Sequence, residues 1–415
     1  MMKYTEALDW LYTQKKLHKR ENLSRIKHCI ELLNIKTNYQ IIHIAGTNGK
    51  GSVASSLNAI LKKMGKRVGM FVSPYVISFN ERIQVNAAYI TDEEVIHYIE
   101  RLQGFSKEYF EKYQDTIPFF ELTFLMALLY FEQKSIDVLI LECGLGGRLD
   151  PTNVLDKDAA VITNIGYDHM KELGPTLFDI AEHKLGITRK NIPCFTCVDE
   201  EILPYFQTYA IANEFPLFYP KKDVSNIQVF EDKTCFTYRN VEYQVSLRGV
   251  FQAYNVSLAL AVIQTLYPKT EETLLNQALM EVTWPGRFER VQSNIILDGA
   301  HNLPGIEALV ETLKTAYPNR KIKVVFTALR DKMISDMLST LDAVTERYYF
   351  TTIQDSRASE LESFTTLTSK PYQLFSSYQE AICRARNELK EEELLIITGS
   401  LHFISEARKY LMEKE

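Results

Sequence analysis

Cysteine is scarce in this sequence. Six cysteines, at positions 29, 143, 194, 197, 235 and 383, are spread over 415 residues. So few thiols in so long a chain exclude a scaffold built on disulfides, which small secreted domains need because their cores are small. Cys194 and Cys197 form a CxxC pair, but they lie in the apolar run IPCFTCV and no second pair accompanies them. Residues three apart on a strand face opposite sides, so we predict that both pack in the core and bind no metal.

Positive charge is not in excess either. The chain has 47 Lys and Arg residues against 53 Asp and Glu residues, which gives a net charge of −6. Nucleic-acid binding depends on a concentrated Lys and Arg surface, so we predict no nucleic-acid partner. Any anionic ligand must then be held by local features of the chain.

Long apolar runs are absent as well. A membrane-spanning helix needs about 18 or more consecutive apolar residues, and no segment of the chain reaches that length. The opening segment MMKYTEALDWLYTQKKLHKREN carries too many charges for a secretory leader. We therefore predict a cytoplasmic protein with no membrane partner, and we expect it to be a monomer.

The pattern of the chain predicts two α/β domains. With 415 residues it exceeds what one hydrophobic core usually supports. From residue 41 short apolar runs alternate with helical patterns, which is typical of a parallel sheet covered by helices. The clearest strands of this first part are residues 41–45, 68–72, 138–141 and 159–163.

A change of pattern marks the boundary between the two parts. Residues 227–247 alternate as short strands and predict a small antiparallel annex, which helices at 251–266 and 271–281 follow. Trp284-Pro285-Gly286 then interrupts any regular element. We predict domains at 1–286 and 287–415, the second with strands at 295–297, 321–326, 348–351 and 394–397.

A glycine-rich turn joins the strand at 41–45 to the helix after it. The turn consists of Gly46, Thr47, Asn48, Gly49, Lys50, Gly51 and Ser52. Glycines let backbone N–H groups converge on phosphate oxygens, a helix N-terminus favours negative charge, and Lys50 adds a positive one. Gly51 between Lys50 and Ser52 departs from the GxxxxGK[ST] spacing. We predict a nucleotide-phosphate site; the alternative is a tight glycine turn without a ligand.

Two polar residues follow strands and are candidates for a metal site. Glu142 ends the apolar run 138–141, at the edge where parallel sheets bind ligands. Nucleotide phosphates require Mg²⁺, which prefers oxygen ligands, so we predict Glu142 as a magnesium ligand rather than a solvated strand end. His169 follows the strand at 159–163, but a single histidine is more often structural, and its spacing alone leaves its role open.

Longer motifs occur along nearly the whole chain. They are GTNGKGS, VSPYVISFNERIQVN, ECGLGGRLDPTN, NIGYDHMKELGPTLFDIAEHKLGI, WPGRFERV and DGAHNLPG, and they continue through TALRDKM to GSLHFISEA. In order and spacing they resemble the folylpolyglutamate synthase/dihydrofolate synthase family of the Mur ligase superfamily. The resemblance implies an N-terminal P-loop ATPase domain and a C-terminal Rossmann-like α/β domain, with ATP and substrate bound between them.

The resemblance also implies roles for individual residues. The turn at 46–52 would hold the ATP phosphates, with ATP and Mg²⁺ as cofactors and two magnesium sites. The implied magnesium ligands are Ser73, Glu142 and His169. The implied nucleotide contacts of the later part of the chain are Asn255, Arg287 and Asp298. The implied pterin and substrate residues are Arg82, Phe120, Glu121 and Asp150.

The catalytic group implied by the resemblance is Lys50, His169, Lys184 and His301. Lys184 matches a lysine that is carbamylated by CO₂ in the family; the alternative is an ordinary helix lysine that is solvated or paired with an acid such as Glu182. Three positions depart from the usual pattern, namely Tyr75, His183 and Phe251. None of them removes a phosphate or metal group, so they bear on substrate preference and fine positioning.

The reaction implied is ATP-dependent ligation. A carboxylate is activated as an acyl phosphate, and the amine of L-glutamate then displaces phosphate. Extension of tetrahydrofolate is our first expectation, and an additional reaction of dihydropteroate with glutamate is the second. A peptidoglycan-precursor ligase would need an N-terminal domain longer than the 45 residues before Gly46. A P-loop kinase or NTPase would leave the second domain and Lys184 unexplained, and an inert binding protein would not need Lys50, Glu142, His169 and Asp298 together.

Overall fold

The computed structural model describes residues 2–15 and 22–412, so the charged opening segment is described only in part. The chain is α/β throughout, as predicted, and divides into two compact units. The first unit comprises Met1–Ile165, His169–Lys221 and Leu258–Ala278, and the second comprises Gly166–Asp168, Lys222–Ser257 and Leu279–Glu415. By its contacts the antiparallel annex therefore groups with the second unit, whereas the domain boundary at 286 stays a prediction.

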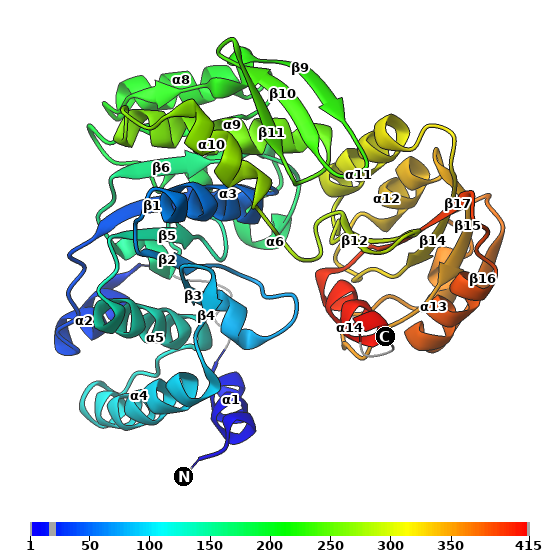
Figure 1. Cartoon of the computed structure of the whole chain (residues 1–415). Coiled ribbons are helices and arrows are strands. Elements are labelled where there is room, and N and C mark those ends of the chain that lie inside the picture. Colours follow the sequence, from blue (N-terminus) through cyan, green and yellow to red (C-terminus); the bar gives the residue numbers. More distant parts are fainter. Residues whose placement is uncertain (1, 16–21, 413–415) are drawn as a thin grey trace. The chain divides into compact units, whose positions relative to one another are not determined.

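The first unit is built on an eight-stranded sheet, drawn in blue to green in Figure 1. Its strands are, in spatial order, β4 (Ala88–Tyr89), β3 (Ile83–Val85), β2 (Val68–Phe71), β5 (Val138–Glu142), β1 (Gln40–Ala45), β6 (Ala159–Ile162), β7 (Cys194–Thr196) and β8 (Leu217–Phe218). The strand β3 runs antiparallel to both of its neighbours, β2 and β4, and the other neighbouring strands of this sheet are parallel. The strands predicted at 41–45, 68–72, 138–141 and 159–163 are confirmed.

Burial on both faces explains why these strands are continuous apolar runs. Every residue of β5 and β6 is buried, as is every residue of β1 after Gln40. Cys194 lies in β7, and both Cys194 and Cys197 are buried free thiols. The prediction that this CxxC pair packs in the core is confirmed.

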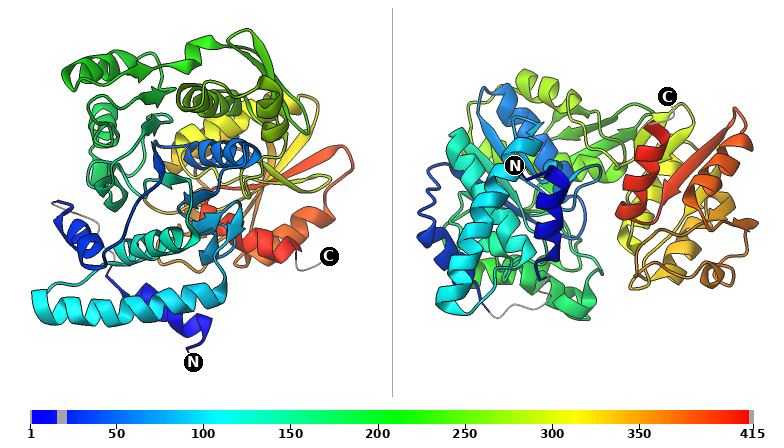
Figure 2. Two further views of the ribbon diagram at one scale, coloured as in Figure 1. Left: turned by 60° about the vertical axis from the view of Figure 1, so that its left-hand side comes forward. Right: turned by 90° about the horizontal axis from the view of Figure 1, so that it is seen from below.

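Helices cover both faces of this sheet. They are α1 (Tyr4–Thr13), α2 (Ser24–Leu32), α3 (Lys50–Lys63), η1 (Phe79–Arg82), α4 (Asp92–Tyr113), α5 (Phe119–Lys134), η2 (Pro151–Val154), α6 (Met170–Leu173), α7 (Leu177–Leu185) and α8 (Leu203–Ala212). One hydrophobic core cluster lies around α4 and α5. The helix α5 contacts β2 and β3, and α4 packs beside α5, as Figures 1 and 2 show. Thr91 is the N-cap residue of α4 and forms a capping box with Glu94.

The annex in the second unit is a three-stranded antiparallel sheet. Its strands are β9 (Val224–Val229), β10 (Thr234–Tyr238) and β11 (Val241–Val245), and the 3₁₀ helix η3 (Pro220–Asp223) precedes them. Arg239 and Asn240 have φ of 50° and 64°, which is typical of a two-residue hairpin turn. The helices α9 (Val250–Leu266) and α10 (Glu272–Met280) follow, as predicted.

A six-stranded sheet forms the rest of the second unit. Its strands are, in spatial order, β12 (Glu289–Gln292), β13 (Ile295–Leu297), β17 (Glu393–Thr398), β14 (Lys321–Phe326), β15 (Thr345–Phe350) and β16 (Tyr372–Leu374). All neighbours are parallel except β12 and β13. Its helices are α11 (Leu303–Ala316), α12 (Ile334–Leu341), η4 (Leu361–Phe364), α13 (Tyr378–Asn387) and α14 (Leu401–Met412). The sequence predicted this second set of alternating strands and helices.

No helix within residues 2–15 and 22–412 has the length and apolar character needed to span a bilayer.

Candidate active site

The glycine-rich turn leaves β1 between its two parallel neighbours β5 and β6 and enters α3. Gly46 has φ +146°, and a Cβ there would lie 1.8 Å from Oγ1 of Thr163, so a side chain cannot fit. The Thr47 N–H donates to the carbonyl of Asn164 at 3.1 Å, and the Asn48 N–H donates to Asn164 Oδ1 at 2.9 Å. The loop after β6 therefore sets the shape of this turn.

Lys50, Glu142 and Ser73 are brought together at the same edge of the sheet. Lys50 Nζ donates to the carbonyls of Gly46 and Thr47 at 3.0 and 3.1 Å, and it lies 3.9 Å from Glu142 Oε1. The Ser73 N–H donates to Glu142 Oε2 at 3.2 Å. Glu142 is the last residue of β5 and is buried. A cation, a carboxylate and a hydroxyl residue thus adjoin a turn suited to phosphate.

His169 lies after β6 and immediately before α6, with φ 51°. Among the described residues, no group of three or more His, Cys, Asp or Glu side chains is arranged to hold a metal ion. A carboxylate beside a serine and a phosphate cradle still suits Mg²⁺, which keeps several waters and takes further ligands from nucleotide phosphates. Glu142 and Ser73 fit that ion, and the metal role of His169 stays a prediction.

Arg82 is buried in an aromatic cage that the sequence did not reveal. Its guanidinium carbon lies 5.2 Å from the ring centre of Tyr75 and 5.7 Å from that of Phe119. Tyr12 stacks on Phe119, with ring centres 5.7 Å apart, and its hydroxyl lies 3.0 Å from that of Tyr75. Burial lowers the pKa of Arg82, although nearby Tyr75, Tyr12 and Glu142 oppose that shift.

Arg82 Nε is buried and, within the described structure, has no hydrogen-bond partner. An orphaned guanidinium donor costs free energy unless a ligand or water satisfies it. Tyr75 is one of the positions that depart from the family pattern, and the structure places its ring against Arg82. The aromatic members of the cage come from segments up to about a hundred residues apart, which is why no local motif reveals them.

The other three predicted substrate residues differ in their surroundings. Phe120 covers Gly144, where an added Cβ would lie 2.6 Å from the ring. Glu121 accepts two hydrogen bonds of 2.9 Å from Arg25 of α2, through Nε and Nη2. Asp150 caps η2 and lies in the loop after β5. The structure thus gives Glu121 a bidentate ion pair, and the substrate roles of all three stay predictions.

Lys184 lies near the end of α7 and is only 4% exposed. Burial raises the pKa of the thiol of Cys143, the residue after Glu142. The charge of nearby Lys184 opposes part of that rise. The Glu182 carboxylate is instead bonded to Arg148 at 2.7 Å. Lys184 is therefore buried rather than solvated, and its catalytic role stays a prediction.

Asp298 follows β13 in the second unit, at the carboxyl edge of a parallel sheet. Its Oδ2 accepts the N–H of Phe288 at 2.8 Å, and its Oδ1 accepts the N–H of Ala300 at 2.9 Å. Burial raises the pKa of the Asp298 carboxyl, and the charge of Arg287 offsets part of that shift. The structure therefore brings Arg287 and Asp298 together.

His301 belongs to the same cluster. Its Nδ1 lies 2.8 Å from the carbonyl of Gly299, which also accepts a hydrogen bond of 3.4 Å from Arg287. Its Nε2 lies 3.6 Å from Oδ2 of Asp168. Asn255 lies on α9, where its Nδ2 donates to Gln252 at 3.1 Å. The nucleotide and catalytic roles of these residues stay predictions.

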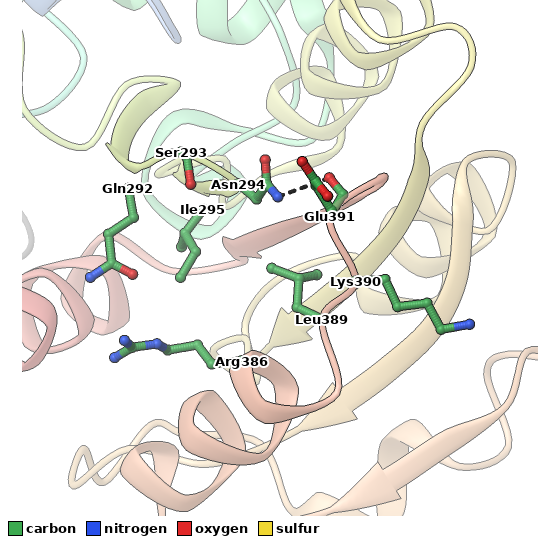
Figure 3. Close-up of a pocket in the computed structure, with 8 residues that line it drawn as sticks. All are labelled: Gln292, Ser293, Asn294, Ile295, Arg386, Leu389, Lys390 and Glu391. Carbon is green, nitrogen blue, oxygen red and sulfur yellow. Dashed lines mark hydrogen bonds between the residues drawn. The ribbon is translucent and has the colours of Figure 1, made fainter.

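A cavity of about 230 Å³ opens elsewhere on the second unit. It is lined by Gln292, Ser293, Asn294, Ile295, Arg386, Leu389, Lys390 and Glu391, as Figure 3 shows. The Asn294 side chain bonds the Glu391 carbonyl at 3.0 Å across one wall. It contains none of the candidate site residues, and it lies beside the loop before β13 rather than at the carboxyl edge that bears Asp298.

Two domain families match the chain. The Mur ligase middle domain matches residues 44–263, and the Mur ligase glutamate ligase domain matches residues 286–401. A curated relative, the dihydrofolate synthase/folylpolyglutamate synthase of Bacillus subtilis (strain 168), is 33% identical over 428 residues. That alignment covers 98% of this chain and 99% of the relative.

Solved structures of similar proteins cover the same extent. E. coli FolC in complex with DHPP and ADP superimposes with a TM-score of 0.88 at 26% identity, over 100% of this chain and 98% of that one. The bifunctional folylpolyglutamate synthase/dihydrofolate synthase of Yersinia pestis, complexed with AMPPNP and a Mn ion, gives a TM-score of 0.88 at 26% identity. The superposition covers 99% of this chain and 98% of the Yersinia pestis chain.

Proposed function

Because this chain belongs to the folylpolyglutamate synthase/dihydrofolate synthase family of Mur ligases, a family of ATP-dependent ligases, we propose that it adds L-glutamate to tetrahydrofolate. The observation that carries the proposal is the grouping of Lys50, Glu142 and Ser73 beside the glycine-rich turn. A kinase-like phosphate site alone would not require the glutamate ligase domain at residues 286–401.

The chemistry begins with a carboxylate, whose oxygen is a poor leaving group. The substrate carboxylate attacks the γ-phosphorus of ATP, the bond to the β-phosphate oxygen breaks, and an acyl phosphate and ADP result. Lys50 and the N–H groups of the turn at 46–52 stabilise the phosphoryl charge. Glu142 and Ser73, with His169 as the third predicted ligand, would hold Mg²⁺, which would supply further neutralisation of the phosphate oxygens. The glutamate amine then attacks the acyl carbon, phosphate leaves, and the amine proton passes to solvent or a base.

The folate side of the reaction is assigned to Arg82, Phe120, Glu121 and Asp150. Arg82 supports this best, because its buried Nε would gain an acceptor from an anionic or carbonyl-bearing substrate. The cage rings offer flat apolar surfaces to an aromatic ligand. Phe120 against Gly144 adds another such surface near Glu142.

We propose that the side chain of Lys184 is modified to a carbamate. Its neutral amine would attack CO₂, form an N–C bond and lose one proton, which gives an anionic carbamate oxygen. Burial near Cys143 supports the proposal, because a desolvated lysine is more readily neutral and an unmodified ammonium would repel magnesium. The carbamate would serve a second magnesium site.

In the second unit we assign Asn255, Arg287 and Asp298 to ATP and His301 to the reacting groups. The shared Gly299 carbonyl and the close approach of Arg287 to Asp298 support a single cluster. A second activity, dihydropteroate with glutamate, is favoured by the bifunctional relatives and by the DHPP that E. coli FolC binds.

Glutamate-dependent release of ADP tests the proposal. Purified protein with ATP and Mg²⁺ should release ADP only when a folate and L-glutamate are both present. ADP release that needs neither substrate would indicate an NTPase instead. Equal stimulation by other amino acids would place the chain with another Mur-type ligase.

A further inference from the structure

Buried polar side chains form a hydrogen-bonded network around β1, the strand that leads into the glycine-rich turn. His43, in the middle of β1, is 0% exposed, and Lys157, in the loop before β6, is 5% exposed. Thr152 and Asn153 of η2 are buried beside them. The proposed chemistry uses none of these side chains, although burying so many polar groups is costly unless each is satisfied.

The first branch of the network runs in one direction from Lys157 to Asp150. Thr152 Oγ1 donates to Asp150 Oδ1 at 2.6 Å, so this hydroxyl oxygen can only accept from His43 Nε2, which lies 2.8 Å away. Burial holds the pKa of His43 well below its usual value, so the ring is neutral and Nδ1 carries no proton. Nδ1 therefore accepts from Lys157 Nζ at 3.1 Å.

The second branch begins at the same amine. Lys157 Nζ donates to Asn153 Oδ1 at 2.7 Å. The Asn153 Nδ2 group then donates to two carbonyls, that of Arg148 at 3.1 Å and that of Gly186 at 3.0 Å. Arg189 Nη2 also donates to Asn153 Oδ1, at 3.0 Å. One amine thus orients both the histidine and the asparagine.

The two branches end on the two segments that carry candidate catalytic groups. Asp150 Oδ2 accepts the N–H groups of Gly144 and Leu145 at 3.0 and 2.9 Å, directly after Glu142 and Cys143. Gly186 directly follows α7, which bears Lys184. The Arg148 N–H also donates to the carbonyl of His183 at 2.7 Å. The network therefore ties the end of β5 to the end of α7.

We propose that Lys157 is a positioning residue of the ligase centre, which fixes the loop after β5 and the end of α7 so that Glu142 and Lys184 keep a constant spacing. The identity of the positioned groups rests on the proposed function. A neutral amine suits this place, since burial, aided by the charge of Arg189, lowers the pKa of Lys157 to about 7. The amine can then donate to both partners without a full buried charge.

The test compares Lys157→Met, which keeps an unbranched stem and removes the amine, with the wild-type chain. Mn²⁺ binding is measured by electron paramagnetic resonance with a non-hydrolysable ATP analogue, beside kcat, KM for ATP and the thermal midpoint. Residues that orient metal ligands typically change metal affinity or activity by about 10- to 100-fold. We expect at least about tenfold weaker Mn²⁺ binding and a similar loss of kcat, with KM for ATP changed less.

Variants of Thr152 and Thr196 separate positioning from loss of stability. Thr152→Val breaks the first branch and should weaken Mn²⁺ binding, whereas Thr152→Ser keeps the hydroxyl and should restore it. In the double variant Lys157→Met/Thr152→Val the loss of Mn²⁺ affinity should be smaller than the sum of the two single losses, because both substitutions break the same series of hydrogen bonds. Thr196→Val removes another buried hydroxyl, which donates to the Ile162 carbonyl at 2.8 Å, and should lower the thermal midpoint without changing Mn²⁺ affinity.

Unchanged Mn²⁺ affinity and kcat in Lys157→Met and Thr152→Val, with only a lower thermal midpoint, would overturn the proposal. If Lys157→Met does not fold, Thr152→Val and Thr152→Ser decide it by the same titration. A wild-type chain that ligates neither tetrahydrofolate nor dihydropteroate would contradict the proposed function. Mn²⁺ binding needs no folate, so the titration would still decide whether Lys157 is a positioning residue.

Discussion

Asp150 in the first unit and Asp298 in the second both accept backbone N–H groups near the carboxyl edge of a parallel sheet, but different structures stand behind them. Asp150 is the end of a buried side-chain network through Thr152, His43 and Lys157. Asp298 is held by two backbone N–H groups, those of Ala300 in its own turn and of Phe288 just before β12, and it lies near the charge of Arg287. The first site therefore depends on a chain of buried side chains, whereas the second depends mainly on backbone N–H groups.

The largest expected effect is at Lys50 in the first unit. Lys50→Ala should reduce glutamate-dependent ADP release about a hundredfold or more, since losing a charge contact to the transferring phosphate costs roughly 2.7 kcal/mol or more. Its side chain bonds loop carbonyls rather than the core, so the thermal midpoint should change little. Lys62→Ala, at the far end of α3, is the control and should keep full activity. Activity of Lys50→Ala within about tenfold of wild type would contradict the assignment.

Lys184 tests whether the end of α7 belongs to the same site. Lys184→Ala should lose most activity, and acetate or propionate should restore a measurable part by entering the vacated space near magnesium. Steady-state rates with and without the acid measure this, and ¹³C-bicarbonate NMR of the wild type should show a carbamate signal. Lys190→Ala, which removes an exposed partner of Glu214, should show neither loss nor rescue. Full activity in Lys184→Ala would dispose of a catalytic role.

Changes at the second cluster should be smaller and local. Arg287→Ala and Asp298→Ala should each raise KM for ATP or lower kcat about tenfold, because a hydrogen bond to a charged group contributes about 1.5 kcal/mol or more. Asp298→Asn keeps an oxygen for one N–H group and should lose less than Asp298→Ala. Arg347→Ala, which removes a partner of Glu388 near the start of β15, serves as the control. Wild-type ATP kinetics in both alanine variants would remove the second unit from nucleotide binding.

The pH dependence of stability tests the buried network without any ligand. The folded-state pKa of Lys157 is about 7, below the ordinary lysine value of 10.5, so between these values the unfolded chain holds a proton that the folded chain lacks. Stability therefore rises with pH across that window, and the free energy of unfolding of wild type relative to Lys157→Met should increase by about 2 kcal/mol from pH 7 to pH 9. Urea unfolding of both proteins at the two pH values measures it. A constant difference would mean that Lys157 titrates normally.

The sequence predicted well what is local in the chain. The turn from β1 into α3 combines an apolar strand, glycines and a lysine within a dozen residues, so strand, turn and helix could be read together. The alternating residues 227–247 predicted the annex, which the structure builds from β9, β10 and β11. Glu142 was found because it ends a buried parallel strand, and the structure places it beside Lys50.

Contacts between distant segments could not be predicted in the same way. Glu121 was assigned to substrate, and its tie to Arg25 joins residues 96 positions apart. His43 and Lys157 are 114 positions apart, and His43 looks like one more residue of an apolar strand. Such pairs depend on which strands become neighbours in the sheet, and a single sequence carries no signal for that.

The mass of the product tests the central claim most directly. Purified protein is incubated with ATP, Mg²⁺ and isotopically labelled L-glutamate, together with tetrahydrofolate or dihydropteroate, and the folates are analysed by mass spectrometry. We predict a folate heavier by one labelled glutamyl residue, joined by an amide and formed only with ATP. Consumption of ATP with no glutamylated product from either substrate would contradict the assignment as a folate–glutamate ligase.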